Sequence, residues 1–271
     1  MVIFFKTIIK LTIILLTLGL LFSFSTFWYF SSDLPDYKIL SNYKPPISSR
    51  VHSGEGQLIA EYALQKRLFI PYDSIPEKVI HSFLSSEDKN FFSHPGVDAK
   101  SITRAIIKNI KNIFSEKRLE GASTITQQVA KNFLLTNEVS IKRKIKEAIL
   151  AFRIEKALSK ERILELYLNK IYLGYGSYGV AAAALNYFDK SLYELSLAEL
   201  AFIAGLPKAP NNYHPIKNHK HAFDRRNWVL GRLFIDGRIS SMDLAEAIKQ
   251  PLVVKEPRKT DFFLADYFLE E

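Results

Sequence analysis

The stretch SSEDKNFFSHPG, residues 85–96, sets two neighbouring acids, Glu87 and Asp88, close to two phenylalanines and a Pro–Gly turn. A core helix does not need adjacent carboxylates, and a solvated loop does not need phenylalanines beside them. The pattern therefore indicates acids at the edge of an apolar wall, where loss of hydration raises the pKa of a carboxyl group towards that of a useful general base. A helix end with ordinary surface charges is the alternative, and this stretch alone leaves both interpretations open.

The composition of the chain limits the classes of protein to consider. Its 271 residues carry a formal net charge of +9 and are 48% hydrophobic, which is enough for one large domain or two small ones with a core. The absence of cysteine excludes disulfides and thiolate metal sites. The surplus of positive charge favours an anionic partner, either nucleic acid, anionic lipid or a phosphate-bearing substrate.

An uncharged apolar run near the N-terminus indicates which of these partners is favoured. Residues 11–30 form a run long enough to span a bilayer as one helix, for which about 20 residues are needed. Lys6 and Lys10 precede the run while Asp33 and Asp36 follow it, so the N-terminus is expected in the cytoplasm and the rest of the chain outside. A cleaved signal peptide is the alternative, but no clear small-residue cleavage site is present. This location favours phosphate-bearing lipid over nucleic acid.

Hydrophobic periodicity predicts one mainly helical (mainly α) domain beyond the apolar run. Residues 33–46 are polar and rich in proline, as in a linker, and residues 48–69 alternate around glycines, as in a small hairpin. Helices are predicted over residues 75–87, 102–114, 124–135, 140–158, 159–171, 196–204, 224–235 and 241–248. The amphipathic helix at 102–114 fits the core of a domain and a membrane surface equally well.

Two further stretches concentrate polar groups. In GASTITQQ, residues 121–128, a helix begins on which Thr124, Gln128 and Lys131 share one face and Asn132 adds an amide. Such a helix N-terminus suits a sugar or phosphate oxygen, although an ordinary polar N-cap is the simpler alternative.

The second polar stretch is KRKIKE, residues 142–147. Arg143 and Glu147 lie one helical turn apart and are expected to pair, while the other cations stay free. Basic runs are more often solvated faces than binding sites. The stretch GYGSYG, residues 174–179, matches the spacing of a dinucleotide-binding turn, but it follows a helix rather than a strand, so this class is rejected.

Taken in order, five segments resemble the motifs of the peptidoglycan glycosyltransferases, the transglycosylase domains of class A penicillin-binding proteins and of monofunctional transglycosylases. They are EDKNFFSHPG (87–96), GASTITQQ (121–128), RKIKE (143–147), KERILELYLN (160–169) and RRNWVL (225–230). The resemblance covers about residues 62–248, and the first two motifs are highly specific as a pair. Ala122 stands where the family often has a second glycine, which leaves the side-chain chemistry unaffected.

The resemblance implies a lysozyme-like helical domain with a smaller membrane-dipping lobe at residues 102–114. It divides the chain into a cytoplasmic tip and transmembrane anchor (1–32), a linker and hairpin (33–61), the glycosyltransferase domain (62–250) and a linker-like segment (251–271). It also implies a single-pass protein of the bacterial cytoplasmic membrane, with its catalytic domain on the outer side. Residues 257–271 resemble the linker before a transpeptidase domain, so a monofunctional enzyme and the front of a bifunctional one both fit.

The implied substrates are lipid II and the growing glycan strand. Glu87 would be the general base that deprotonates the acceptor 4-hydroxyl, which attacks the anomeric carbon with inversion to a β-1,4 bond. Lys131, Arg143 and Lys144 would neutralise the departing undecaprenyl pyrophosphate, and Glu147 would lie near it or hold a divalent cation, Mg or Mn. The remaining residues implied in substrate binding are Asp88, Phe91, His94, Thr124, Gln128, Asn132 and Lys217.

The resemblance implies other partners too. The membrane would be contacted through the N-terminal helix and the apolar lobe, other cell-wall synthesis proteins would associate, and moenomycin would inhibit. No organic cofactor and no nucleic acid are expected, and Arg225 and Arg226 are expected to hold the fold rather than touch substrate. Two alternatives stay open: a lysozyme-like peptidoglycan hydrolase, which would not need the cations, and an inactive cell-wall scaffold, against which intact Glu87 and Glu147 argue.

Overall fold

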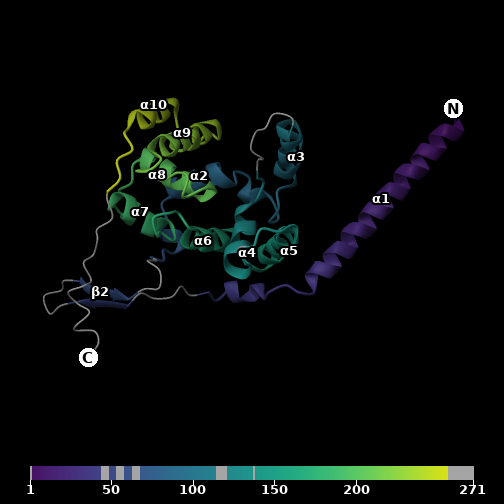
Figure 1. Ribbon diagram of the computed structural model, residues 1–271, viewed down its shortest axis with the longest axis horizontal. Helices are drawn as coiled ribbons and strands as arrows, with labels where there is room; N and C mark the ends of the chain where they lie inside the picture. The colour runs from purple at the N-terminus through teal and green to yellow at the C-terminus, as the bar shows by residue number, and fades with distance from the viewer. Residues whose placement is uncertain are drawn as a thin grey trace.

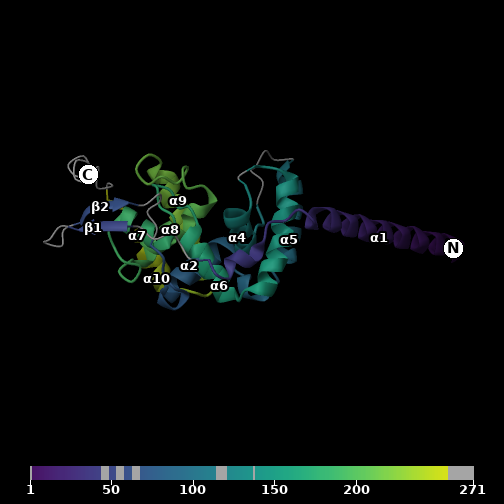
Figure 2. The ribbon, with the colours of Figure 1, turned by 90° about the horizontal axis from the view of Figure 1, so that it is seen from below.

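One long helix projects from a helical body, and a two-stranded hairpin lies at the other end of that body (Figures 1 and 2). The computed structural model describes residues 2–43, 49–52, 58–62, 68–113, 121–136 and 138–255. The mainly helical architecture and the N-terminal apolar helix are confirmed. The linker-like segment predicted at residues 257–271 lies outside the described residues.

The projecting helix is α1 (Val2–Ser31), which contains the predicted apolar span. Its 30 residues correspond to about 45 Å of helix, longer than the roughly 30 Å hydrocarbon core of a bilayer. Most of its side chains pack against no other part of the protein. By length and composition, α1 can therefore cross a membrane.

The end of α1 is fastened to α5 (Ile141–Ala157). Arg153 donates hydrogen bonds to the hydroxyl and carbonyl oxygens of Ser31, and the ammonium of Lys146 lies 2.8 Å from a carboxylate oxygen of Asp33. The 3₁₀ turn Tyr37–Leu40 follows, and Leu40 is completely buried. The described part of the predicted linker is thus packed on the domain rather than free of it.

The predicted hairpin is confirmed. Strands β1 (Ser49–His52) and β2 (Leu58–Tyr62) pair antiparallel, with Ser49 opposite Tyr62. The register shifts between Val51 and His52, where β1 has a bulge or irregularity.

The helices of the body follow the predicted pattern closely. They are α2 (Glu77–Glu87), α3 (Ala99–Ile113), α4 (Ile125–Leu134), α5, α6 (Lys160–Lys170), α7 (Val180–Phe188), α8 (Leu197–Gly205), α9 (His219–Ile235) and α10 (Ser241–Lys249). Helix α7 was not predicted, because the glycine cluster before it obscured its start, where Gly179 caps the helix at a φ of 84°. Helix α9 begins at His219 rather than at residue 224, so the loop before it is shorter than predicted.

Helix α3 begins before residue 102 because Asp98 caps it. The Asp98 carboxylate accepts hydrogen bonds from the backbone N–H of Ser101 (3.0 Å), the Ser101 hydroxyl (2.6 Å) and the Asn90 amide (3.0 Å). Although burial alone would raise the pKa of Asp98, the bonds from Ser101 and Asn90 lower it to about 2. The cap ties the start of α3 to the 85–96 stretch.

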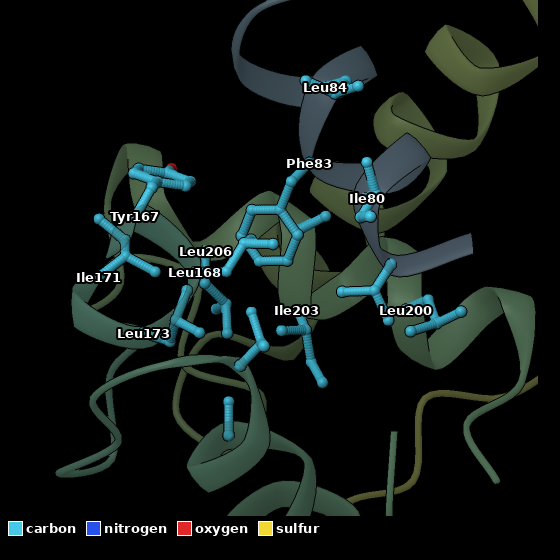
Figure 3. Packing of buried hydrophobic residues seen from close by; sticks show 14 of the residues in the cluster. Ile80, Phe83, Leu84, Tyr167, Leu168, Ile171, Leu173, Leu200, Ile203 and Leu206 are labelled. Atoms are coloured by element: carbon cyan, nitrogen blue, oxygen red, sulfur yellow. The ribbon is translucent and has the colours of Figure 1, made fainter. Parts of the chain in front are cut away.

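The core lies where α2, α6 and α8 meet (Figure 3). Phe83 of α2 stands edge-on to Tyr167 of α6, with ring centroids 6.1 Å apart, and Ile203 of α8 belongs to the same cluster. The buried face of α2 includes Val79, Phe83 and Leu84, at the helical spacing that places side chains towards one side. This packing fixes the C-terminal end of α2, where Glu87 stands.

A polar face of α6 holds the segment that leads into α2. The Asn169 side chain accepts a hydrogen bond from the N–H of Ile70 and donates one to its carbonyl oxygen, both at 2.8 Å. It also donates to the carbonyl oxygen of Glu165, and the Glu165 carboxylate accepts from the N–H of Tyr72 at 2.8 Å. Side-chain bonds therefore satisfy backbone groups that no sheet partner satisfies.

Replacing Asn169 with alanine should lower the free energy of unfolding by about 1–3 kcal/mol, because backbone groups of Ile70 lose their partners. Urea unfolding of both proteins measures the difference. Asn211→Ala is the matched control, since Asn211 is exposed and its change should stay within about 0.5 kcal/mol. Equal effects of the two substitutions would contradict the role of Asn169.

Candidate active site

Glu87 is the last residue of α2, and its carboxylate is held on both oxygens. One oxygen accepts a 2.8 Å hydrogen bond from the Gln128 amide of α4, and the other lies 3.9 Å from the Arg225 guanidinium of α9. The side chain is 12% exposed, so it is mostly buried yet still reached by solvent. Burial raises the pKa of Glu87 above its usual range, although Gln128 and Arg225 act in the opposite direction.

The sequence explains why the carboxylate emerges there. Glu87 lies one helical turn after Phe83, so it continues the buried face of α2 to the rim of the core. The helix then stops, because Asp88 leaves helical geometry with φ −158° and ψ 74°. The prediction of an acid at the edge of an apolar wall, with a raised pKa, is confirmed for Glu87.

Asp88, the second acid of the pair, is tied up inside the protein. His94 Nε2 lies 3.0 Å from each oxygen of the Asp88 carboxylate. Since His94 Nδ1 accepts from the N–H of Gly96, the proton is placed on Nε2, which donates to Asp88. Asp88 also accepts from the N–H of Ile125, in the first turn of α4, where a carboxylate is favoured. The adjacent acids thus have different roles.

Thr124 completes this connection. Its hydroxyl donates to the carbonyl oxygen of Gly96 at 2.6 Å and accepts from the N–H of Gln127, whose side chain closes a capping box. Gly96 has a φ of +98°, and a Cβ there would come within 2.8 Å of the Ala151 carbonyl oxygen, so glycine is required.

Lys160, which sequence reasoning did not single out, packs against the ring of Phe91. The Lys160 ammonium lies 4.4 Å from the centre of the Phe91 ring, donates to the carbonyl oxygen of His94 at 2.7 Å, and pairs with Glu155 at 2.8 Å. Its position at the head of KERILELYLN was the only available signal. Asp88, Phe91, His94 and Thr124 are all buried, and the bonds of Asp88 and Thr124 hold the first turn of α4. Substrate binding by these four residues stays a prediction.

A second charged cluster centres on Glu147, whose side chain is 3% exposed. Arg143 donates to one of its carboxylate oxygens, as predicted, and the Lys144 ammonium lies 2.7 Å from the other. The expectation that Lys144 stays free was wrong, because the i,i+3 and i,i+4 spacings bring both cations to one carboxylate. Two cations around one carboxylate leave this cluster with a net positive charge.

Helix α4 connects the two clusters. Gln128 binds Glu87, and Ser123, just before the helix, accepts a 2.6 Å hydrogen bond from Lys144. Lys131 and Asn132, one turn beyond Gln128, are half-buried, and neither side chain has a hydrogen-bond or ion-pair partner within the described ranges. The structure therefore brings Lys131 onto the helix that joins the carboxylate at 87 to the cations at 143 and 144.

Other expected residues fall outside this arrangement. Lys217 is exposed in the loop before α9, and no described contact joins it to either cluster. No group of three or more histidine or acidic side chains in the described part of the chain is placed to hold a metal ion. Glu147 offers one carboxylate that two cations already share, so these residues do not form a prepared Mg or Mn site. A divalent cation at Glu147 stays a prediction.

Two groups beside Glu87 were not anticipated. Arg225 was expected only to hold the fold, yet its guanidinium faces the Glu87 carboxylate. Tyr167 has a buried hydroxyl without a hydrogen-bond partner among the described residues. Burial, followed by the charges of Glu87 and Asp88, raises the pKa of Tyr167 well above its usual value.

Arg226 does hold the fold. It is completely buried and donates to the carbonyl oxygens of Gln250 (2.5 Å) and Ile248 (3.0 Å) at the end of α10.

Comparisons with known proteins show the family to which this chain is similar. A family model described as "Transglycosylase" matches residues 55–234. "Penicillin-binding protein 1A" of Rickettsia prowazekii (strain Madrid E) is 48% identical over 97% of this chain and 33% of its own length. The protein of the same name from Aquifex aeolicus (strain VF5) is 47% identical over 88% of this chain and 32% of its own length. The chain thus spans about a third of the length of these curated relatives.

A crystal structure of penicillin-binding protein 1A from Haemophilus influenzae also matches, with 29% identity and a TM-score of 0.46. The match covers 80% of this chain and 22% of that one.

Replacing Glu87 with glutamine should stabilise the protein at pH 8 and change little at pH 4. The raised pKa means that the folded protein favours the protonated carboxyl, so stability contributed by Glu87 is lost as pH rises from the usual 4.5 through the raised value. Glutamine resembles the protonated form at every pH. Thermal midpoints across this range measure the effect.

Glu194→Gln is the control for this prediction, because hydrogen bonds from Ser191 lower the pKa of that exposed carboxyl. Its substitution should leave stability unchanged or reduce it at pH 8. A lower thermal midpoint for Glu87→Gln at pH 8 than for the unmodified protein would contradict the buried-charge account.

Proposed function

Because the chain belongs to the transglycosylase family, we propose that it is a peptidoglycan glycosyltransferase that polymerises lipid II into β-1,4-linked glycan strands and releases undecaprenyl pyrophosphate. One observation carries the proposal. A buried carboxylate with a raised pKa, Glu87, is joined through α4 to a net cationic cluster around Glu147. A base and a site for a departing anion are the two requirements of this reaction.

The base in this proposal is Glu87. Its carboxylate takes the proton of the acceptor 4-hydroxyl as that oxygen bonds to the anomeric carbon of the growing strand. The bond from that carbon to the pyrophosphate breaks, so the configuration inverts. Burial makes Glu87 a stronger base than a solvated carboxylate, and the Gln128 hydrogen bond fixes its orientation.

The leaving group in this proposal is a pyrophosphate, which needs positive charge as its bond breaks. Arg143 and Lys144 are held by Glu147 in fixed positions, and Lys131 adds an ammonium without a partner in the described residues. Preorganised cations in a partly dry site stabilise developing charge without reorganising at the moment of reaction. A peptidoglycan hydrolase would also use a buried acid, but it would have no need of these cations.

The membrane is the proposed location, because the substrate carries a lipid. In this proposal α1 is a single-pass anchor in the bacterial cytoplasmic membrane, with its N-terminus inside and the catalytic domain outside. Ile106, Ile107 and Ile110 are each about half exposed at helical spacing on α3, an apolar surface that fits contact with the bilayer. Other cell-wall synthesis proteins are proposed partners, and moenomycin is the proposed inhibitor.

The full chain should polymerise labelled lipid II in detergent, and Glu87→Gln should reduce the rate at least a hundredfold, the lower range for loss of a general base. Gel separation of the glycan products measures polymerisation, moenomycin should inhibit it, and circular dichroism shows whether the variant is folded. Glu194→Gln is the matched control and should retain full activity. Undiminished glycan synthesis by folded Glu87→Gln would overturn the role of Glu87.

Contact of α3 with the bilayer is tested with an environment-sensitive fluorophore. Because the chain contains no cysteine, Ile107→Cys accepts a single probe. In lipid vesicles its emission should shift to the blue and be quenched by brominated acyl chains, since the probe would enter the apolar boundary. Met242→Cys is the control, because Met242 is exposed and lies on α10. Equal responses at the two positions would contradict bilayer contact by α3.

A further inference from the structure

We propose that Arg225 is the positioning residue of the Glu87 carboxylate, so that the base is held between α9 and α4 rather than by α4 alone. This inference rests on the proposed function. It differs from the expectation that the RRNWVL segment only holds the fold.

The Arg225 guanidinium is fixed independently of Glu87. Its Nε donates to the carbonyl oxygen of Gly205 at 3.1 Å, at the end of α8. The guanidinium carbon lies 4.0 Å from the centre of the Trp228 ring, a cation–π contact. A Cβ at Gly205 would come within 3.0 Å of Arg225 Cγ, so glycine lets the side chain lie against α8. The cation is therefore in place before any substrate arrives.

From that position Arg225 reaches the end of α2. One terminal nitrogen lies 3.9 Å from a carboxylate oxygen of Glu87 and 3.3 Å from the Ser86 hydroxyl. The other Glu87 oxygen accepts from Gln128. Each oxygen has its own partner on a different helix, which restricts rotation of the carboxylate about its last bond.

The charges around Glu87 single out Arg225 as the cation that matters. Asp88 lies beside it on the same segment, Tyr167 approaches from α6, and Lys208 approaches from the 3₁₀ turn Leu206–Lys208. Lys208 is exposed, so solvent and salt screen it. The Arg225 and Glu87 side chains are only 8% and 12% exposed, so their attraction is screened far less. Arg225 opposes the burial that raises the pKa of Glu87.

Arg226 shows what a purely structural arginine looks like in the same helix. It bonds to carbonyl oxygens at the end of α10 and stacks on the Phe223 ring, with its guanidinium carbon 4.1 Å from the ring centre. No described contact joins it to Glu87. Neighbouring arginines on one helix thus point to different tasks, and Arg226 is the matched control.

The experiment compares Arg225→Gln, Arg225→Lys and Arg226→Lys in the full chain. The dependence of kcat/KM on pH is measured for lipid II polymerisation, together with thermal midpoints. The acid limb of this profile is the low-pH side, where activity rises as the base loses its proton. Loss of an opposite charge at this distance should move the acid limb upward by about one pH unit in Arg225→Gln. Its activity should then fall about tenfold more on the acid limb than on the plateau at higher pH. Arg225→Lys keeps the charge and should stay near the original acid limb.

Arg226→Lys should lower the thermal midpoint without moving the acid limb. If Arg225→Gln lowers the midpoint but leaves the acid limb in place, Arg225 is structural and the inference fails. Should Arg225→Gln not fold, Arg225→Met takes its place, because it removes the charge and keeps the apolar stem beside Trp228.

A stability cycle tests the same contact without activity. The change in thermal midpoint caused by Glu87→Gln is measured at pH 8 in two backgrounds, the unmodified protein and Arg225→Gln. Glutamine should stabilise the protein more when that charge is absent, because an ionised Glu87 then has one partner fewer. Additive effects would overturn the inference. If the unmodified chain forms no glycan, the proposed function fails, while this cycle still decides whether Arg225 acts on Glu87.

Discussion

Keeping one carboxylate mostly out of water is the constraint on which the rest of the site depends. Burying a charge is costly unless donors and an opposite charge compensate for it. Glu87 receives one donor from α4 and one cation from α9, so three helices must meet within a few ångströms of it. The core around Phe83 supplies the rigid end of α2 that such a meeting requires. Fold and site are therefore consequences of the same packing.

The 85–96 stretch separates its two acids by what each one contacts. Asp88 is saturated by His94 and by the first turn of α4, and Thr124 fastens that turn to Gly96. These bonds fix α4, and α4 presents Gln128 to Glu87. Asp88 thus does its work through the helix it holds, while Glu87 keeps an exposed edge. Adjacent carboxylates in a sequence need not share a function when one is fully hydrogen-bonded.

Local patterns predicted the helices and located Glu87, because caps, periodicity and the i,i+4 spacing of Arg143 and Glu147 are properties of neighbouring residues. Apart from α7, whose start the glycine cluster obscured, what they missed depends on contacts between distant segments. Arg225 meets Glu87 across 138 positions of sequence, and Lys160 donates to His94, 66 residues earlier. Both residues lie in segments that resemble family motifs, but no local pattern predicts these contacts. Lys144 was misjudged for a different reason. The i,i+3 spacing of Lys144 and Glu147 allowed an ion pair between them. Only the fold, however, shows that Glu147 is buried enough to hold two cations.

Helix α5 relates the proposed leaving-group site to the membrane. Its first turns hold Arg143, Lys144 and Glu147, while Lys146 and Arg153 of the same helix fasten the end of α1 at Asp33 and Ser31. Figure 2 shows α1 leaving the body beside α5. If α1 spans the bilayer as proposed, its end marks the membrane surface, and a lipid-linked pyrophosphate lies at that same surface. Helix α5 then fixes Arg143 and Lys144 relative to the end of α1, and Glu87, the proposed base, is joined to them through Gln128 and Ser123 on either side of the start of α4.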